Sequence, residues 1–113
     1  MNVYISIPIS GRDLTEAKMH AEWLKATLME HGHKAITPFD VCPEPDKSYA
    51  YYIGKNITAV LDENTDAVLF GSNFDKSKGC LLEYQASMIY GKHKVYEDAF
   101  PFLDFKTLTP KMN

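Results

Sequence analysis

Two short segments of this chain hold the residue types that bind anions and attack electrophilic carbon. The first, residues 6–12, reads Ser-Ile-Pro-Ile-Ser-Gly-Arg, and the second, residues 72–83, reads Ser-Asn-Phe-Asp-Lys-Ser-Lys-Gly-Cys-Leu-Leu-Glu. Each leads into a stretch with helical spacing, so backbone N–H groups and the positive end of a helix dipole face the segment. Together the two segments indicate a site for a small, anionic molecule.

The candidate binding residues of the first segment are Ser6, Pro8, Ser10, Gly11 and Arg12. Serine hydroxyls and backbone N–H groups suit phosphate or carboxylate oxygens, and a guanidinium adds a charge-assisted contact. The glycines are too few for a Walker loop or a dinucleotide fingerprint. An ordinary strand-to-helix turn with a surface arginine remains an open alternative.

The second segment offers a nucleophile. Glu83 follows Gly79 by one helical turn on the same face, and a carboxylate held beside a crevice can attack an anomeric carbon. Gly79 allows a ligand to approach the backbone closely, and the hydroxyl of Ser77 suits a sugar or phosphate oxygen. The alternative is a solvated helix glutamate beside an ordinary serine cap.

The elements that position these segments follow from the pattern of apolar residues. Strands are expected at residues 3–7, 34–37, 66–70 and 94–96, and helices are expected after Asp13, Ser48 and Gly79, with loops at residues 38–48 and 71–79. Strands that alternate with helices predict one α/β domain over residues 1–113, with three layers and a mostly parallel sheet of the flavodoxin-like or Rossmann-like kind.

In open parallel sheets, ligands bind beyond the carboxyl ends of the strands, which is where both segments fall. The apolar residues of the last segment, 96–113, predict either a fifth element or a contact with another subunit.

Composition excludes several classes of function. A net charge of −3 over 113 residues gives no electrostatic surface for duplex nucleic acid, and no apolar run approaches the roughly 20 residues that cross a membrane. Two cysteines cannot build a disulfide framework and no signal peptide is visible, which together indicate a cytoplasmic protein. The four histidines lack ligand spacing, so we expect neither a metal nor a cofactor.

Several motifs occur in a familiar order over about residues 3–96. They are Tyr4-Ile5-Ser6-x-Pro8-Ile9-Ser10-Gly11, Gly32-His33, Thr37-Pro38, Tyr52-x-x-x-Asn56, Asp66-Ala67-Val68 and Phe74-x-x-Ser77-x-Gly79-x-x-x-Glu83. This ordered set resembles the nucleoside 2-deoxyribosyltransferase-like family, which includes the 2′-deoxynucleoside 5′-phosphate N-hydrolases.

The resemblance implies an enzyme, an N-glycosidase or deoxyribosyltransferase, that acts on a nucleoside or its 5′-monophosphate. Glu83 matches the family nucleophile, which attacks C1′ and forms a covalent glycosyl-enzyme, and Tyr4 matches the tyrosine that orients it. Ser77 matches a serine of the nucleotide hydrolases, and Asn56 and Phe74 match positions that border the substrate. The family also implies a homodimer or a higher homo-oligomer.

Three positions depart from the family pattern. Asn56 stands where the family carries an aspartate that delivers a proton to the leaving base, and an amide cannot act as a general acid. Ile7 stands where glycine is usual, and Phe74 stands where tryptophan is common. The alternative is therefore a non-catalytic nucleotide-binding module of the same fold, and a third reading is a protein that keeps the fold only for oligomerisation.

Overall fold

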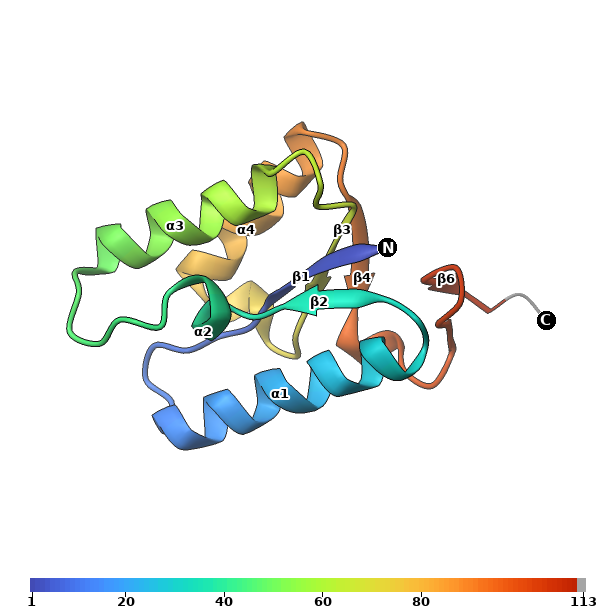
Figure 1. The fold of residues 1–113 in the computed structure, drawn as a ribbon, viewed down its shortest axis with the longest axis horizontal. Helices are drawn as coiled ribbons and strands as arrows, with labels where there is room; N and C mark the ends of the chain where they lie inside the picture. Colours follow the sequence, from blue (N-terminus) through green and yellow to red (C-terminus); the bar gives the residue numbers. More distant parts are fainter. Residues whose placement is uncertain (112–113) are drawn as a thin grey trace.

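The centre of the protein is a parallel sheet of four short strands, in a computed structural model that describes residues 1–111 (Figure 1). The strands are β1 (Asn2–Ser6), β2 (Lys34–Ile36), β3 (Ala67–Phe70) and β4 (His93–Tyr96), in the order β2-β1-β3-β4. Every neighbouring pair is parallel. The predicted fold class, a three-layer α/β domain of the flavodoxin-like kind, is confirmed.

The alternation of side chains along β1 assigns one face of the sheet to each helical layer. Val3 and Ile5 belong to the core that contains Leu24 and Leu28 of helix α1 (Leu14–Glu30). Tyr4 points to the opposite face and joins a second core on that side of the sheet. Strand β1 therefore contributes side chains to both cores, and the hydroxyl of Tyr4 lies on the face of the sheet that α1 does not cover.

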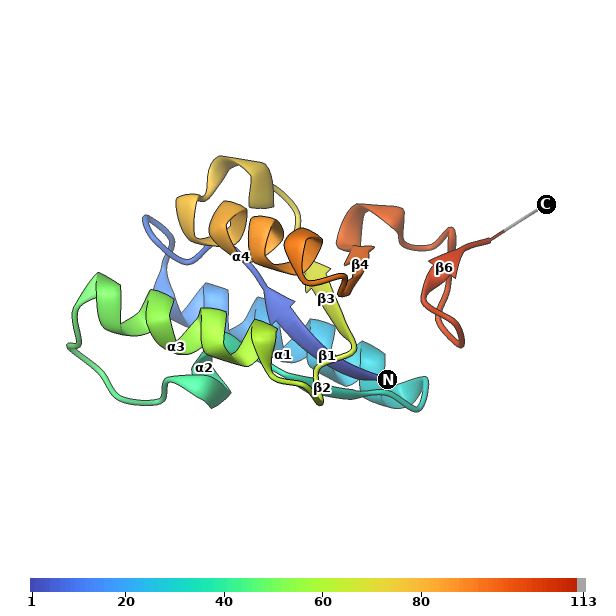
Figure 2. The same cartoon turned by 90° about the horizontal axis from the view of Figure 1, so that it is seen from above.

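Helices α3 (Tyr49–Leu61) and α4 (Lys78–Ile89) cover that second face, and they run side by side in the same direction (Figures 1 and 2). Helix α3 begins where the sequence predicts, whereas α4 begins at Lys78, inside the predicted loop over residues 71–79. The reason is the same kind of cap: the hydroxyls of Ser48 and Ser77 accept hydrogen bonds from the N–H groups of Tyr51 and Cys80, at 3.1 and 3.3 Å. None of the helices in the described residues has the length and apolar character needed to span a bilayer.

The prediction of a continuous loop over residues 38–48 is wrong at its start. Helix α2 (Pro38–Val41) forms one turn there because Thr37 and Asp40 make a capping box. The N–H of Asp40 donates to the Thr37 hydroxyl at 3.1 Å, and the N–H of Thr37 donates to the Asp40 carboxylate at 2.9 Å. Pro38 occupies the first turn, where its missing N–H is not needed. The remaining residues of this stretch, up to the start of α3, are irregular.

The C-terminal segment packs on its own domain. After the 3₁₀ turn η2 (Glu97–Ala99), strands β5 (Leu103–Asp104) and β6 (Thr109–Pro110) form a small antiparallel pair. Leu103 and Leu108 are buried in the core beneath α1. This pair lies at the opposite end of the molecule from the connection between α2 and α3 (Figures 1 and 2). The fifth element is therefore present, whereas a contact of residues 96–113 with another subunit stays a prediction.

Candidate active site

Glu83 is the buried carboxylate of the candidate site. It lies on the second turn of α4, which places its side chain against the end of β1, and only 4% of the residue is exposed. Tyr4 and Ser6 are two residues apart on β1, so both hydroxyls face α4. The Tyr4 hydroxyl donates to Oε1 of Glu83 at 3.1 Å, and the Ser6 hydroxyl donates to Oε2 at 3.0 Å. Each carboxylate oxygen thus has its own donor.

Burial decides the protonation of this group. Loss of water raises the pKa of Glu83 to about 7, although the hydrogen bonds from Ser6 and Tyr4 oppose that rise by stabilising the carboxylate. Burial, and next the nearby charge of Glu83, raise the pKa of Tyr4 well above its ordinary value. Tyr4 therefore remains a hydrogen-bond donor at any physiological pH, while Glu83 titrates near neutrality, a perturbed pKa of the kind that clusters at functional sites.

A cleft of about 870 Å³ opens above Glu83, a size that suits a nucleoside or a nucleotide. Its walls come from the loop after β1, from α2 and the chain that follows it, from the start of α3, and from the loop that leads into α4. Pro8, Ser10, Asn56, Ser77 and Gly79 all line it, as does Glu83. The structure therefore brings together most of the residues that the sequence nominated from its two segments.

Asn56 reaches the cleft from α3. The two helices touch near their beginnings, where a Cβ on Gly79 would lie 3.0 Å from Cδ1 of Ile53. Asn56 follows Ile53 by about one turn of α3, Glu83 follows Gly79 by about one turn of α4, and both residues line the cleft. Asn56 is 8% exposed, and its amide oxygen faces the Cys42 thiol, with Sγ and Oδ1 3.8 Å apart. The amide NH₂ is left as the donor toward the cleft.

Gly79 controls the width of the cleft. Gly79→Ala is expected to raise KM about tenfold with a smaller change in kcat, because the added methyl group occupies ligand space beside Ile53 and Tyr49. Stability should change little, since alanine is favoured over glycine in helices by about 0.5–1 kcal/mol, while the methyl group crowds Cδ1 of Ile53 at 3.0 Å. Gly54→Ala is the matched control, because a Cβ there meets nothing within 4 Å. Steady-state kinetics of both variants, once a substrate is found, check the prediction, and equal KM values would contradict it.

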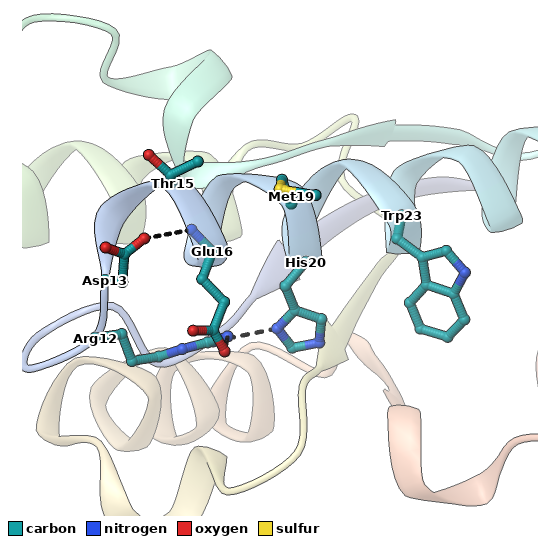
Figure 3. Close-up of a pocket in the computed structure, with 7 residues that line it drawn as sticks. All are labelled: Arg12, Asp13, Thr15, Glu16, Met19, His20 and Trp23. Carbon is teal, nitrogen blue, oxygen red and sulfur yellow. Dashed lines mark hydrogen bonds and ion pairs between the residues drawn. The ribbon is translucent and has the colours of Figure 1, made fainter.

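Arg12 turns away from the cleft. Its guanidinium donates to the backbone oxygen of Pro8 at 3.0 Å and lies 3.2 Å from Nδ1 of His20, under the first turns of α1 (Figure 3). His20 in turn holds the Glu97 carboxylate at 2.9 Å. These contacts tie the loop after β1 to the end of β4. Arg12 thus lines a separate, shallow hollow on α1 and not the cleft above Glu83.

Four further nominated residues also lie outside the cleft lining: Tyr4 and Ser6, whose hydroxyls bind Glu83, and Phe74 and Gly11. Phe74 packs against Phe70, Tyr84 and Tyr96, with ring centroids 5.1 to 5.8 Å apart, and so supports the loop from behind. Gly11 adopts a left-handed conformation with φ of +81°, which explains the glycine as a turn residue.

Ile7 fits because β3 ends at a glycine. Ile7 lines the cleft and is 4% exposed, and a Cβ on Gly71 would lie only 2.7 Å from its Cγ2 atom. The two positions compensate: the bulky side chain on one strand occupies the space that the neighbouring strand leaves empty.

Several cleft residues were not among the binding residues expected from the sequence, although Tyr52 belongs to the motif that ends at Asn56. Lys18 of α1, Lys76 of the 3₁₀ turn η1 (Phe74–Lys76) and Lys78 of α4 bring positive charge to the cleft, and Tyr49 and Tyr52 bring aromatic rings. Tyr52 also closes the α2–α3 loop, since its hydroxyl donates to the backbone oxygen of Glu44 at 2.8 Å. Lysines on solvated surfaces are common, and only the fold shows that these three converge.

Comparisons with solved structures place this fold among known enzymes. A 2-deoxyribosyltransferase from Bacillus psychrosaccharolyticus superposes with a TM-score of 0.66 and 20% identity, over 100% of this chain and 99% of that protein. A 2-desoxiribosyltransferase from Leishmania mexicana superposes with a TM-score of 0.60 and 18% identity, over 84% of this chain but 62% of that longer protein. No protein-family model and no curated protein matched the chain. The likeness shows that the chain has the fold of these transferases.

Proposed function

We propose that this protein cleaves or exchanges the N-glycosidic bond of a nucleoside, or of its 5′-monophosphate, with Glu83 as the nucleophile. The observation that carries the proposal is a buried carboxylate, held by Tyr4 and Ser6, at the floor of a nucleoside-sized cleft. The shared fold with two 2-deoxyribosyltransferases supports deoxyribose as the sugar.

In the proposed double displacement each of these groups has a role. The ionised carboxylate of Glu83 forms a bond to the anomeric carbon while the C–N bond breaks and its electron pair stays with the base. Tyr4 and Ser6 hold the carboxylate in position and share its charge before the attack. Water or a second base then attacks the same carbon, the C–O bond to Glu83 breaks, and the sugar keeps its original configuration.

Three lysines support a phosphorylated ligand. Lys18, Lys76 and Lys78 line the cleft together with the hydroxyls of Ser10 and Ser77. Ammonium groups and hydroxyls bind phosphate oxygens by charge-assisted hydrogen bonds. The 5′-phosphate proposed from the sequence thus has candidate partners, although Arg12 is not one of them.

The direct test is release of free base. The purified protein is incubated with a panel of ribo- and deoxynucleosides and their 5′-monophosphates, with and without a second base, and the products are separated by liquid chromatography. Release of free base from one member of the panel, or exchange of its base, is expected. If no base is released or exchanged from any of them, the enzymatic proposal fails.

The pH dependence of kcat/KM should follow the ionisation of Glu83. Since the ionised form attacks, kcat/KM is expected to rise about tenfold per pH unit below 7 and to level off above it. Ser6→Ala removes a hydrogen bond that stabilises the carboxylate, so the rise should move to higher pH. Ser87→Ala is the matched control, because this buried serine of α4 bonds only the backbone oxygen of Tyr84 among the described residues. A profile that is the same in all three proteins would contradict the assignment.

One observation favours a second function. Asn56 supplies the cleft with an amide and no transferable proton, which suits a non-catalytic nucleotide-binding module. This alternative predicts saturable binding of a nucleotide by calorimetry, with no release of base.

A further inference from the structure

The uncharged polar groups around Glu83 share one property: none is suited to protonating a leaving base. Lys18, Lys76 and Lys78 also line the cleft, but none of them forms an ion pair with Glu83 among the described residues. Asn56 offers an amide, and the cysteines that line the cleft, Cys42 and Cys80, have a thiol pKa that burial raises. The Tyr4 hydroxyl already donates a hydrogen bond to Glu83 itself. In the described residues, the other carboxylates of the lining belong to Glu22 and Glu44, and both residues are exposed to solvent.

Glu83 cannot act as the general acid for the leaving base either. A carboxyl group that attacks the anomeric carbon must be ionised, so the same group holds no proton for the base in that step. A neutral purine or pyrimidine would therefore leave as an anion. General acid catalysis typically accelerates a reaction by about 10²- to 10⁴-fold, and substrates with neutral bases do not receive this acceleration in the cleft.

We infer that the preferred substrates of this site are N-glycosides whose leaving base is already cationic, that is, a quaternised nitrogen heterocycle such as a pyridinium or an N7-alkylated purine. The inference rests on the proposed function. In the first step the Glu83 carboxylate bonds to the anomeric carbon, the C–N bond breaks, and its electron pair neutralises the ring nitrogen. The base departs neutral without receiving a proton. Water then attacks the anomeric carbon, restores the carboxylate and releases its extra proton to solvent.

The cleft also suits a cation with hydrogen-bond acceptors. The three lysines of the cleft can bind a phosphate, and none of them forms an ion pair with Glu83 in the part of the chain that the structure describes, so the negative charge of that carboxylate is left for a cationic base. Tyr49 and Tyr52 line the walls with aromatic rings, which attract cations through their faces. The amide NH₂ of Asn56 can donate to a carbonyl oxygen on the base, because its own oxygen faces Cys42. Asn56 would thereby orient the leaving base and select among cationic bases.

The test compares substrates of nearly equal shape that differ in charge. One pair is 2′-deoxyguanosine and N7-methyl-2′-deoxyguanosine, and the other is nicotinamide riboside and its uncharged dihydro form. We measure kcat/KM for base release at pH 8 and subtract the spontaneous rate. The cationic member of each pair is expected to react at least about 100-fold faster. Glu83→Gln, measured on the same substrates, shows which release depends on the site.

The two proposals fail differently. If the neutral member of each pair reacts within about tenfold of the cationic one, and Glu83→Gln abolishes both reactions, the preference for cationic bases is overturned while the proposed function stands. If no substrate of either charge shows release that depends on Glu83, the proposed function falls and the preference falls with it.

Discussion

Glu83→Gln is expected to reduce base release by at least about 10⁴-fold while the protein stays folded. The amide keeps the size of the carboxylate and can still accept from Tyr4 and donate to Ser6, so the packing beneath the cleft is preserved. It cannot form the bond to the anomeric carbon. Activity on the best substrate of the panel, measured with circular dichroism of the same sample, checks the prediction.

Glu83→Gln is also expected to change the stability of the protein, and the change should depend on pH. Burial raises the pKa of Glu83 to about 7 in the folded protein, above its value in the unfolded chain, so ionisation in the folded state is unfavourable. The stability contributed by the protonated group is complete below about pH 4.5 and is lost as the pH rises through 7. Glu83→Gln should therefore raise Tm at pH 8, by a stabilisation of the order of 1–3 kcal/mol, and should change it little at pH 4.

Glu63→Gln is the matched control, because Glu63 is exposed in the turn before β3. It should change neither activity nor the pH dependence of Tm. A Glu83→Gln protein that releases base at the rate of the control would refute the assignment of the nucleophile.

Asn56→Asp is expected to increase base release from neutral nucleosides by about 10²- to 10⁴-fold and to leave cationic substrates nearly unchanged. The carboxyl group would line the cleft, where burial favours its protonated form, and that form can give a proton to the departing base. Steady-state rates on one neutral and one cationic substrate measure the effect.

Asn64→Asp provides the control for added charge, since Asn64 is exposed in the turn after α3. If Asn56→Asp folds and binds nucleotide but gains no activity, the non-catalytic binding module becomes the better account. A gain with neutral and cationic substrates alike would show that the new carboxyl group acts in some other way than as an acid.

Much of the fold can be predicted because local signals agree with it. Asp13 and Ser48 begin α1 and α3 as expected, and the apolar run before Phe70 forms the fully buried strand β3. The missed turn α2 shows where such reasoning fails: three prolines between residues 38 and 45 suggest a loop, although the capping box of Thr37 and Asp40 was present in the sequence.

The same contrast holds for the site: local sequence predicts some of its residues, and tertiary packing decides the others. Gly79 and Glu83 could be found because they lie one turn apart on one helix, and Ser77 could be found because it lies in the loop just before that helix. The orientation of Arg12 could not, since the choice between the cleft and His20 depends on the path of the loop after β1. The convergence of Lys18 with Lys76 and Lys78 likewise needs the packing of α1 against the rest of the fold.

The central claim is that Glu83 attacks the anomeric carbon directly, and the configuration of the product tests it most directly. Turnover of a β-nucleoside in the presence of methanol gives a methyl glycoside whose anomer can be read by proton NMR before it equilibrates. Two successive displacements at one carbon predict the β-anomer. An α-anomer would mean a single displacement by the acceptor, with Glu83 as a base and not a nucleophile.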